Sequence, residues 1–579
     1  MIVQWASRCL PGFGVIALLI LLLLTSDIAS WPWEELDPDL GDAPEGKSHP
    51  LSIAQKIFIV YTILIHVNML GFTVRLAYVL LRIPRETKRA LQRRLTWSYS
   101  PSNGHFFDSP IEATQQVPDP LAFKVDFMTV DEVDEPEVIH AIILPNYKEE
   151  NNTLRTTLNV LASHPRARSQ YEVYLAMEQK EIGAFEKAET LSSTYEKSFR
   201  CIHSTFHPAG LPGEIAGKSS NVAFAAQHIA QVHRAALISG ACNVIVTVMD
   251  ADTHLWQDYF TEIRRLHYTY VEEAERTLYC CPIIFDRNAH EVPILVRCAD
   301  LLWSFAGLST MYPGSTVSIP TSVYSLPLSL VERVGGWDSD PTAIGEDMHM
   351  MLKCYFETAG KVVTRVIHIP ASQCNVASDT GRGWRRSLDT CFARYRQALR
   401  HMWGALDSGF AARRTMRYFR RCLFLQPRHM LLFHLLFEAH FLPCQLIILI
   451  IFSAAYEHLI PPTQLHPDMA WTLRVTDILR TSSFIGMNVC LALYERWHAL
   501  CLHMRKKDML DANLTDTGFS RRIWWRWSFL LERLCFPIAG TVFGAVPTFQ
   551  ALFSHFWTER LEYRVSKKPA FVTEDIDIA

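Results

Sequence analysis

The chain has 579 residues, of which 49% are apolar and 20% are charged. Its mean hydropathy is +0.07, above the negative values usual for soluble domains, and the composition excludes a disordered, a collagen-like or a small disulfide-stapled protein. The net charge is only −3, so no overall basic field would attract nucleic acid. The length fits two or three domains, and the positive hydropathy predicts strongly apolar segments within the chain.

Four uncharged segments are long enough to cross a bilayer, whose apolar core takes ~20 residues of helix. A fifth uncharged run, at 481–494, is shorter and is a weaker candidate. The first segment also fits a cleaved signal peptide, because Arg8 precedes the apolar run and small residues follow it at Ala29-Ser30. We expect an integral, multi-pass membrane protein with segments at 9–26, 57–74, 439–456 and 534–558.

Charges beside the first two segments predict the orientation of the chain. Residues 27–47 hold seven Asp and Glu and one Lys, whereas residues 82–94 hold six Arg and Lys and one Glu. Basic side chains favour the cytosolic side of a membrane, so we expect residues 82–428 in the cytosol, beside a plasma, Golgi or ER membrane. The Arg- and Trp-containing stretches at 394–428 and 505–526 are typical of helices that lie on the cytosolic leaflet.

After an acidic, Pro-containing linker, strand and helix patterns alternate. Short apolar runs that end in turns are typical of buried parallel strands, and helical spacing marks 152–163 and 220–236 as helices. This rhythm predicts an α/β domain with a mixed, mostly parallel sheet and helices on both faces. Ligands bind such sheets at the carboxyl ends of the strands. The strand patterns lie at 138–145, 171–177, 243–249, 278–285 and 362–369.

Two acidic motifs stand where such a site is expected. Asp250 and Asp252 directly follow the strand at 243–249, and oxygen ligands of this kind suit Mg²⁺ or Mn²⁺ shared with substrate phosphates. Glu346 and Asp347 open an expected helix, where a carboxylate facing a metal-bound diphosphate can act as a general base. The alternatives are a solvated turn for the first motif and a helix cap for the second.

Two further motifs supply cationic and aromatic side chains. Lys218 precedes a helix and can neutralise phosphate, although an ordinary surface lysine is the alternative. On a second helix Gln397 and Arg400 share a face, as do Arg400 and Trp403, whose ring can stack on a sugar. The alternative for this second helix is an amphipathic interfacial role, and both roles are compatible.

In order and spacing these motifs resemble the membrane-embedded glycosyltransferases of family 2, such as cellulose, chitin and hyaluronan synthases and ceramide glucosyltransferase. The resemblance covers about 138–405, together with the flanking membrane segments, and implies a nucleotide-sugar domain of the glycosyltransferase A type. It makes Asp347, beside Glu346, the catalytic base, and it makes Asp250 and Asp252 the residues that hold the nucleotide and a divalent cation. It further implies nucleotide contacts from Tyr147, Glu149, Glu178, Lys218 and Asn221, and acceptor contacts from Gln397, Arg400 and Trp403.

The chain departs from the family pattern in places that bear on processivity and on the nucleotide contact. Processive members carry QxxRW, whereas here the Trp of QALRHMW stands three positions after Arg400. Glu178 stands where the family usually has Asp, which bears on the contact to the uracil. Near the C-terminus, YRVSKK resembles the F-x-V-T-x-K gating loop of cellulose synthases, with a basic juxtamembrane tail as the alternative. The matching residues of that loop are Tyr563, Val565, Ser566 and Lys568.

The number of apolar segments conflicts with the basic C-terminal tail. Five spans would place Arg560 and its basic neighbours outside, against the positive-inside rule. The segment 534–558 contains two Pro and two Gly, and our hypothesis is that it forms a re-entrant or hairpin element instead of crossing.

The sequence thus predicts an inverting membrane glycosyltransferase that moves a sugar from a nucleotide-sugar, with UDP as the expected nucleotide, to a polysaccharide, in one version processively and with export. A lipid glycosyltransferase adding a single sugar is the alternative, and a transporter or scaffold with an inactive domain is a different class, against which the intact acids argue. We expect a transmembrane pair at 1–90, a linker at 91–137, the catalytic domain at 138–393, interfacial helices at 394–428, membrane segments at 429–558 and a tail at 559–579.

Overall fold

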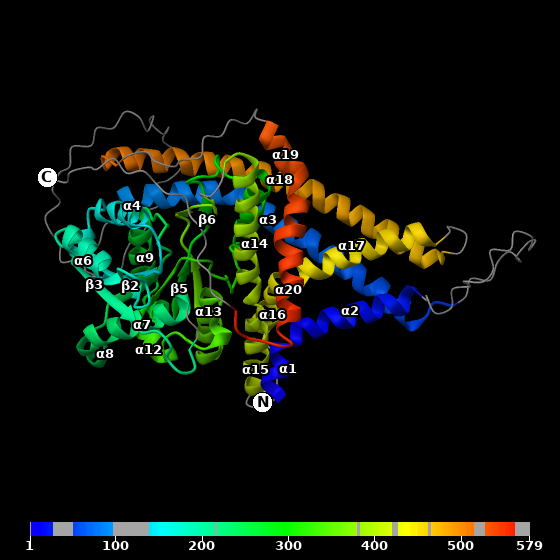
Figure 1. Ribbon diagram of the computed structural model, residues 1–579, viewed down its shortest axis with the longest axis horizontal. Helices are drawn as coiled ribbons and strands as arrows, with labels where there is room; N and C mark the ends of the chain where they lie inside the picture. The colour runs from blue at the N-terminus through cyan, green and yellow to red at the C-terminus, as the bar shows by residue number, and fades with distance from the viewer. Residues whose placement is uncertain are drawn as a thin grey trace, which may run out of the picture.

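The computed structural model has an α/β domain at one end and a helical bundle at the other, with further helices running across between them (Figure 1). Most of the expected linker and all of the possible gating loop, including Tyr563, Val565, Ser566 and Lys568, lie outside the described residues. The structure describes residues 2–26, 50–96, 138–214, 217–378, 382–419, 426–460, 465–514 and 527–561.

The α/β domain is built on a seven-stranded sheet with the order β3-β2-β1-β4-β7-β5-β8. β3, β2, β1 and β4 are parallel, β7 is antiparallel to both of its neighbours, and β8 is parallel to β5. All residues of β2 and β4 are buried, so both faces of the sheet are covered. This confirms the predicted fold class. The strands are β1 (Ile139–Asn146), β2 (Tyr171–Glu178), β3 (Cys201–His207), β4 (Val244–Val248), β5 (Thr277–Cys280), β7 (Tyr324–Pro327) and β8 (Val363–Val366).

One expected strand is divided in two. The run 278–285 forms β5 and then β6 (Ile283–Phe285), which pairs with β9 (Ala371–Gln373) in a separate two-stranded sheet. Pro282 lies at the division and has no N–H to donate to a ladder, so the chain changes sheets there. The sequence patterns also missed β3 and β7, because β3 is a half-buried edge strand and β7 is only four residues long.

The bundle consists of α2 (Leu10–Ser26), α3 (Ile53–Thr96), α17 (Leu442–Leu459) and α18 (Pro467–Asp511). The end of α2, the start of α3, the end of α17 and the start of α18 lie together at the far end of the bundle (Figure 1). All four helices contribute to one apolar core, so they form a single packed unit. The buried members of this core are Leu18, Leu22, Phe58, Ile65, Leu442, Leu449, Tyr456, Met469 and Leu473.

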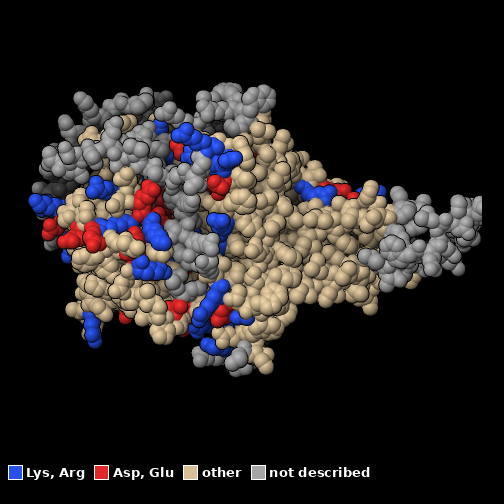
Figure 2. All heavy atoms as spheres, viewed as in Figure 1, with Lys and Arg blue, Asp and Glu red and all other residues tan. Residues whose placement is uncertain are grey.

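Three helices are long and apolar enough to cross a membrane by length and composition alone, namely Ile53–Arg93, Leu442–Leu459 and Leu530–Ser554. A fourth is added if α2 and the short α1 (Ile2–Arg8), bent by 62° against each other, count as one span. Only part of α18 lies in the bundle, and its charged ends keep it outside this class. On the face shown in Figure 2 the bundle surface carries few charged side chains, whereas many lie on the α/β domain.

The last apolar segment forms one rod, made of α19 (Trp527–Gly540), a π-helical turn (Thr541–Ala545) and α20 (Val546–Ser554). The rod runs across the bundle helices instead of alongside them (Figure 1). It packs against α11 (Ile294–Leu308) and α14 (Trp384–Trp403). Among the described residues, 534–558 therefore makes no hairpin, because the backbone absorbs its Pro residues in a π turn and continues.

Two long helices join the bundle to the α/β domain. α3 and α18 lie side by side along much of their length, and both continue past the bundle beside the sheet (Figure 1). The hydroxyl of Thr87 in α3 accepts a hydrogen bond from the indole of Trp497 in α18 (3.3 Å) and donates one to the carbonyl of His368 (2.9 Å). These contacts fix the position of the α/β domain relative to the bundle.

Candidate active site

A cavity opens at the carboxyl ends of β1, β2 and β4, the edge where a mostly parallel sheet binds its ligands. Side chains from two loops and three helices converge on it: the loops after β1 and β4, the start of α7 (Lys218–Val232), the start of α13 (Glu346–Glu357), and α14. The structure brings together eleven of the residues expected in the site: Tyr147, Glu149, Glu178, Lys218, Asn221, Asp250, Asp252, Glu346, Asp347, Gln397 and Arg400.

One end of the cavity combines an aromatic ring with a buried carboxylate. The ammonium group of Lys180 lies 4.6 Å from the ring centroid of Tyr147. Glu178 at the end of β2 is 3% exposed, and its carboxylate lies 3.4 Å from Nδ1 of His207, whose Nε2 lies 2.9 Å from Glu214. The hydrogen bond to Glu178 raises the pKa of His207 against the effect of burial. An anchored carboxylate accepts hydrogen bonds only, so this end suits a ring with an N–H edge.

The middle of the cavity is a compact cluster of one cation and three carboxylates. Nζ of Lys218 lies 2.8 Å from Oδ1 of Asp250 and 3.1 Å from Oε2 of Glu346. Burial opposes the charged form of Lys218, but Asp250, Glu346 and the neighbouring Asp347 raise its pKa. Complete burial raises the pKa of Glu346, although Lys218 opposes this. The start of α7 and the start of α13 are thus tied together across the end of β4.

Backbone groups hold the two functional carboxylates in place. Oδ2 of Asp252, a buried residue, accepts a hydrogen bond from the amide of Cys374 (3.2 Å), and the Asp252 carbonyl accepts one from Arg287 (2.5 Å). Asp347 accepts amide hydrogen bonds from Ser322 (2.7 Å) and Met348 (2.8 Å). A carboxylate at a helix start is also favoured by the helix dipole. Neither side chain is free to rotate.

Asn221 serves the framework of the cavity. Its side-chain amide donates a hydrogen bond to the carbonyl of Ala176 in β2 (2.7 Å), and the residue is 2% exposed. Tyr324 in β7 is a second framework residue, which no sequence pattern indicated. Its hydroxyl donates to Glu346 and accepts from the indole of Trp337 (2.7 Å). Both side chains position their neighbours on the cavity wall.

The part of the cavity where we expected the acceptor differs from the expectation in one residue. Gln397 and Arg400 of α14 line the cavity, but Trp403 lies away from it. Trp403 is 4% exposed, packs edge-on against His555 at 4.9 Å, and donates a hydrogen bond to the carbonyl of Glu559 (3.2 Å). Trp303 of α11 lines the cavity instead, and its ring lies 4.3 Å from that of His401, the residue directly after Arg400.

The carboxylates of Asp250 and Asp252 fit a divalent cation that is shared with a substrate. Among the described residues no three His, Cys, Asp or Glu side chains gather as a complete metal site. Asp250 retains 32% exposure at the cavity, and Asp252 lies two residues further along the same wall. Mg²⁺ and similar hard cations are held by one or two carboxylates together with substrate phosphates, so this pair is sufficient if the substrate carries a diphosphate.

Residues 245–494 match the family model described as Glycosyl transferase family group 2. The chain is a glycosyltransferase. The match confirms the predicted enzyme class, and it includes both acidic motifs of the glycosyltransferase cavity. The chain is also similar to a solved structure, a mannosyltransferase from Pyrobaculum calidifontis in complex with GDP-Man and Mn²⁺, at 14% identity and a TM-score of 0.36, over 72% of this chain and 99% of the other. A search of curated proteins finds no match.

Proposed function

We propose that this glycosyltransferase moves a sugar from a nucleotide-sugar, with UDP as the nucleotide, to an acceptor hydroxyl, and that it inverts the anomeric carbon. The observation that carries the proposal is the convergence of Lys218, Asp250, Glu346 and Asp347 in one cavity at the strand ends. A cluster of this kind provides charge for a diphosphate and a base for an acceptor within the same space.

The nucleotide-sugar spans the cavity, with its uracil ring at the end that holds Tyr147 and Glu178 and its diphosphate at the cluster around Lys218. The carboxylate of Glu178 accepts the N–H of the uracil ring, and Tyr147 with Lys180 covers the ring face. Lys218 offsets the charge of the diphosphate, and Asp250 and Asp252 would hold a divalent cation, Mg²⁺ or Mn²⁺, beside it. Such a cation supplies Lewis-acid stabilisation of the departing diphosphate when it is bound.

Asp347 takes the proton of the acceptor hydroxyl. Its two amide donors orient the carboxylate, and Glu346 beside it stays with Lys218 and Tyr324 as part of the charge framework. The acceptor oxygen attacks the anomeric carbon opposite the departing diphosphate, so the C–O bond to the acceptor forms as the bond to the diphosphate breaks. A single displacement of this kind inverts the configuration.

Two observations bear on the acceptor. The acceptor side has two aromatic rings beside polar groups, which favours a sugar ring and hence a polysaccharide acceptor. These residues are Trp303, His401, Gln397 and Arg400. The same cavity also reaches His440 at the base of the bundle, which favours an acceptor carried on a membrane lipid as the alternative.

Four helices cross the membrane in this proposal: α2, α3, α17 and α18. Only seven residues separate α17 from Pro467, so α18 starts at the end of the bundle where α17 finishes. Its other half reaches the α/β domain, where Arg505 pairs with Asp286 (3.1 Å). A continuous helix between these points crosses again, which leaves the α/β domain and the C-terminus on the cytosolic side.

The rod then lies along the cytosolic leaflet. Near its start the rod reaches the α/β domain through Glu532, which lies 3.5 Å from Arg297. Its end packs through Leu552 on Val15 and Cys444 at the base of the bundle. One side of the rod is an exposed apolar stripe with helical spacing, as in helices that lie in a membrane interface. The stripe contains Leu531, Leu534, Ile538, Val542, Val546 and Phe549.

The test is transfer from radiolabelled UDP-sugars by the purified full-length protein with Mn²⁺, with the product sized on a gel. We expect label in an acceptor product, and we expect Asp347→Asn to abolish transfer while UDP still binds, because the amide cannot accept the proton. Glu357→Gln, at the far end of the same helix, is the matched control and retains transfer. Full activity of Asp347→Asn would refute the base assignment. A product with one added sugar would select the lipid acceptor, and a long polymer the polysaccharide.

A further inference from the structure

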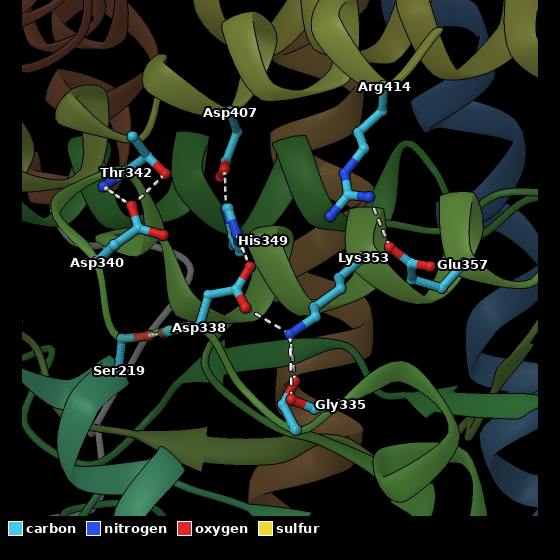
Figure 3. A network of polar contacts seen from close by, with 11 residues as sticks. Ser219, Gly335, Asp338, Asp340, Thr342, His349, Lys353, Glu357, Asp407 and Arg414 are labelled. Atoms are coloured by element: carbon cyan, nitrogen blue, oxygen red, sulfur yellow. Dashed lines mark hydrogen bonds and ion pairs between the residues drawn. The ribbon is translucent and has the colours of Figure 1, made fainter. Parts of the chain in front are cut away.

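A buried network of charged side chains lies directly behind the catalytic base. His349 is in the first turn of α13, two residues after Asp347, and it is 2% exposed. Figure 3 shows its ring between two carboxylates, with Nδ1 2.5 Å from Oδ1 of Asp407 and Nε2 3.1 Å from Oδ2 of Asp338. Lys353, one turn further along α13, lies 2.5 Å from the other oxygen of Asp338.

This geometry requires a protonated imidazole. A neutral ring has one N–H and one lone pair, and here the lone pair would point at a carboxylate oxygen. Two ring nitrogens facing two carboxylates therefore carry two protons. With Lys353 the network contains two cations and two anions, so its charges cancel inside the protein. The network is complete only while His349 is charged.

The pKa shifts agree with this charge state at neutral pH. Burial raises the pKa of Asp407 to about 6, although His349 opposes this, so Asp407 is ionised above that pH. Burial opposes the charged ring, but Asp407 and Asp338 outweigh it and raise the pKa of His349 to about 9. Burial also opposes the ionised form of Asp338, yet His349 and Lys353 lower its pKa to about 2. The remaining groups that face the pair are Asp340 and Asp347, which act on Asp407, and Arg413 of α15.

The network joins three elements that line the cavity. Asp407 belongs to the first turn of α15 (Leu406–Phe419), which follows α14 and its acceptor-side residues. The backbone carbonyl of Asp338 accepts a hydrogen bond from Ser219 (2.6 Å), the neighbour of Lys218 at the start of α7. His349 thus connects the helix of the base to the helix of the acceptor wall and, through Asp338, to the helix of the phosphate-binding lysine.

The helices meet closely at this point. A Cβ atom on Gly345, the residue before α13, would lie 3.2 Å from Oδ2 of Asp407 and 3.6 Å from Cα of Gly404. On its other side α15 packs against α1, where Arg413 donates a hydrogen bond to the hydroxyl of Ser7 (2.6 Å). Little space separates the start of α13 from the interfacial helices, so a change in their distance moves Asp347.

We propose that His349 is a positioning residue, which as an imidazolium bridge between Asp338 and Asp407 holds the base Asp347 at its working distance from the acceptor wall. The proposal rests on the proposed function, in which Asp347 receives the acceptor proton. It assigns His349 no contact with substrate. When the bridge is broken, Lys353 still holds Asp338, whose carbonyl binds Ser219 beside Lys218, so the bridge acts on the rate of transfer and not on nucleotide affinity.

Two substitutions of His349 each keep one of its two hydrogen bonds and remove the other. The amide nitrogen of His349→Asn reaches the place of Nδ1 and keeps the bond to Asp407, whereas that of His349→Gln reaches the place of Nε2 and keeps the bond to Asp338. We expect His349→Gln, which releases α15, to lower kcat about 10- to 100-fold, the effect of misplacing a catalytic group by about 1 Å. His349→Asn should lose less, and the affinity for UDP with Mn²⁺, measured by calorimetry, should stay unchanged in both.

The control is His429→Gln. His429 is buried and makes a ring contact with Tyr355 near the other end of α13 (5.2 Å), so it reports the cost of losing any packed histidine. Equal loss of kcat in His429→Gln and His349→Gln would overturn the proposal, as would a loss of UDP affinity in His349→Gln. Inactive Asp347→Asn with fully active His349 variants would refute the bridge alone, whereas active Asp347→Asn would refute the proposed function itself.

A pH profile adds a readout that packing would not move. We expect the kcat of the natural chain to fall as the pH rises through about 9, where His349 loses its second proton and the bridge opens. In Asp407→Asn one of the two carboxylates that raise this pKa is gone, so the alkaline limb should move to lower pH. An alkaline limb that stays in place in Asp407→Asn and in His349→Asn would contradict the bridge.

Discussion

Trp303 and His401 are the aromatic residues of the proposed acceptor wall. Their ring planes lie at 32° to one another, both residues are half-buried, and both line the cavity beside Gln397 and Arg400. A large aromatic face of this kind offers much contact area to the C–H groups of a sugar ring, and the neighbouring polar groups can meet its hydroxyls. Trp403 makes its contacts inside the protein, with His555 and the backbone of Glu559.

Substitution of the two tryptophans separates these roles. We expect Trp303→Ala to raise the KM for the acceptor about fivefold, which corresponds to about 1 kcal/mol for a lost aromatic contact. Trp403→Phe keeps the packing against His555 and should leave that KM unchanged. The measurement is the initial rate over a range of acceptor concentrations at saturating donor. A raised KM for the acceptor in Trp403→Phe with a normal KM in Trp303→Ala would mean that Trp403, and not Trp303, contacts the acceptor.

The residues that sequence patterns could find are those that follow a strand or start a helix. Asp250, Asp252 and Asp347 are of this kind, because an apolar strand or a helix start fixes where the next side chain lies. Trp303 and His349 could not be found in this way. Trp303 meets His401 from another helix, and His349 has the appearance of an ordinary helix residue until Asp338 and Asp407 approach it from two other segments.

At the scale of the element, the pair α3 and α18 depends on one close approach. A Cβ atom on Gly486 would lie 2.5 Å from Cγ2 of Thr73, and one turn later Sγ of Cys490 lies 3.6 Å from the carbonyl of Thr73. Thr73 is β-branched and has few rotamers with which to move aside. The absence of a side chain at position 486 therefore sets the distance between the two helices that connect the bundle to the α/β domain.

Gly486→Val should lower the stability of the whole protein. Forcing extra methyl groups into a packed contact costs about 1–3 kcal/mol, so we expect a lower midpoint of thermal unfolding in detergent. Thr73→Ala removes the opposing methyl group and should recover part of the loss in the double variant. Gly71→Val is the matched control on α3, because nothing lies within 4 Å of a Cβ atom there. An equal loss in Gly71→Val would mean that the close approach contributes nothing.

Sequence patterns located the apolar elements but not their directions. Hydropathy measures how apolar a segment is, and both the rod and α17 meet that test, although only α17 lies lengthwise in the bundle. α18 fails the hydropathy test, because charged residues such as Arg474 and Asp477 lower its mean hydropathy. It nevertheless shares the core of the bundle through Met469 and Leu473. Direction depends on the tertiary contacts at both ends of a helix, which composition does not contain.

For the molecule as a whole, the arrangement of the helices decides the side on which the chain ends. In the proposed arrangement four crossings return the chain to the side on which it started, and a rod that lies in the interface adds none. We then expect the basic residues near the C-terminus, such as Arg560 and Lys567, on the same cytosolic side as those of 82–94, as the positive-inside rule favours. A rod that crossed would carry them outside, and it would also take its end away from Trp5, whose indole donates a hydrogen bond to Phe556 (3.0 Å).

Protease protection in sealed microsomes, whose outer surface is cytosolic, tests this arrangement. We expect protease to remove an epitope tag at the C-terminus and to spare a tag inserted after Gly46, in the acidic stretch between α2 and α3. Detergent should make the second tag accessible as well, which controls for its intrinsic sensitivity to protease. Protection of the C-terminal tag before detergent is added would mean that the rod crosses the bilayer. The apolar stripe of the rod would then need a lipid or protein neighbour at full membrane depth instead of the interface.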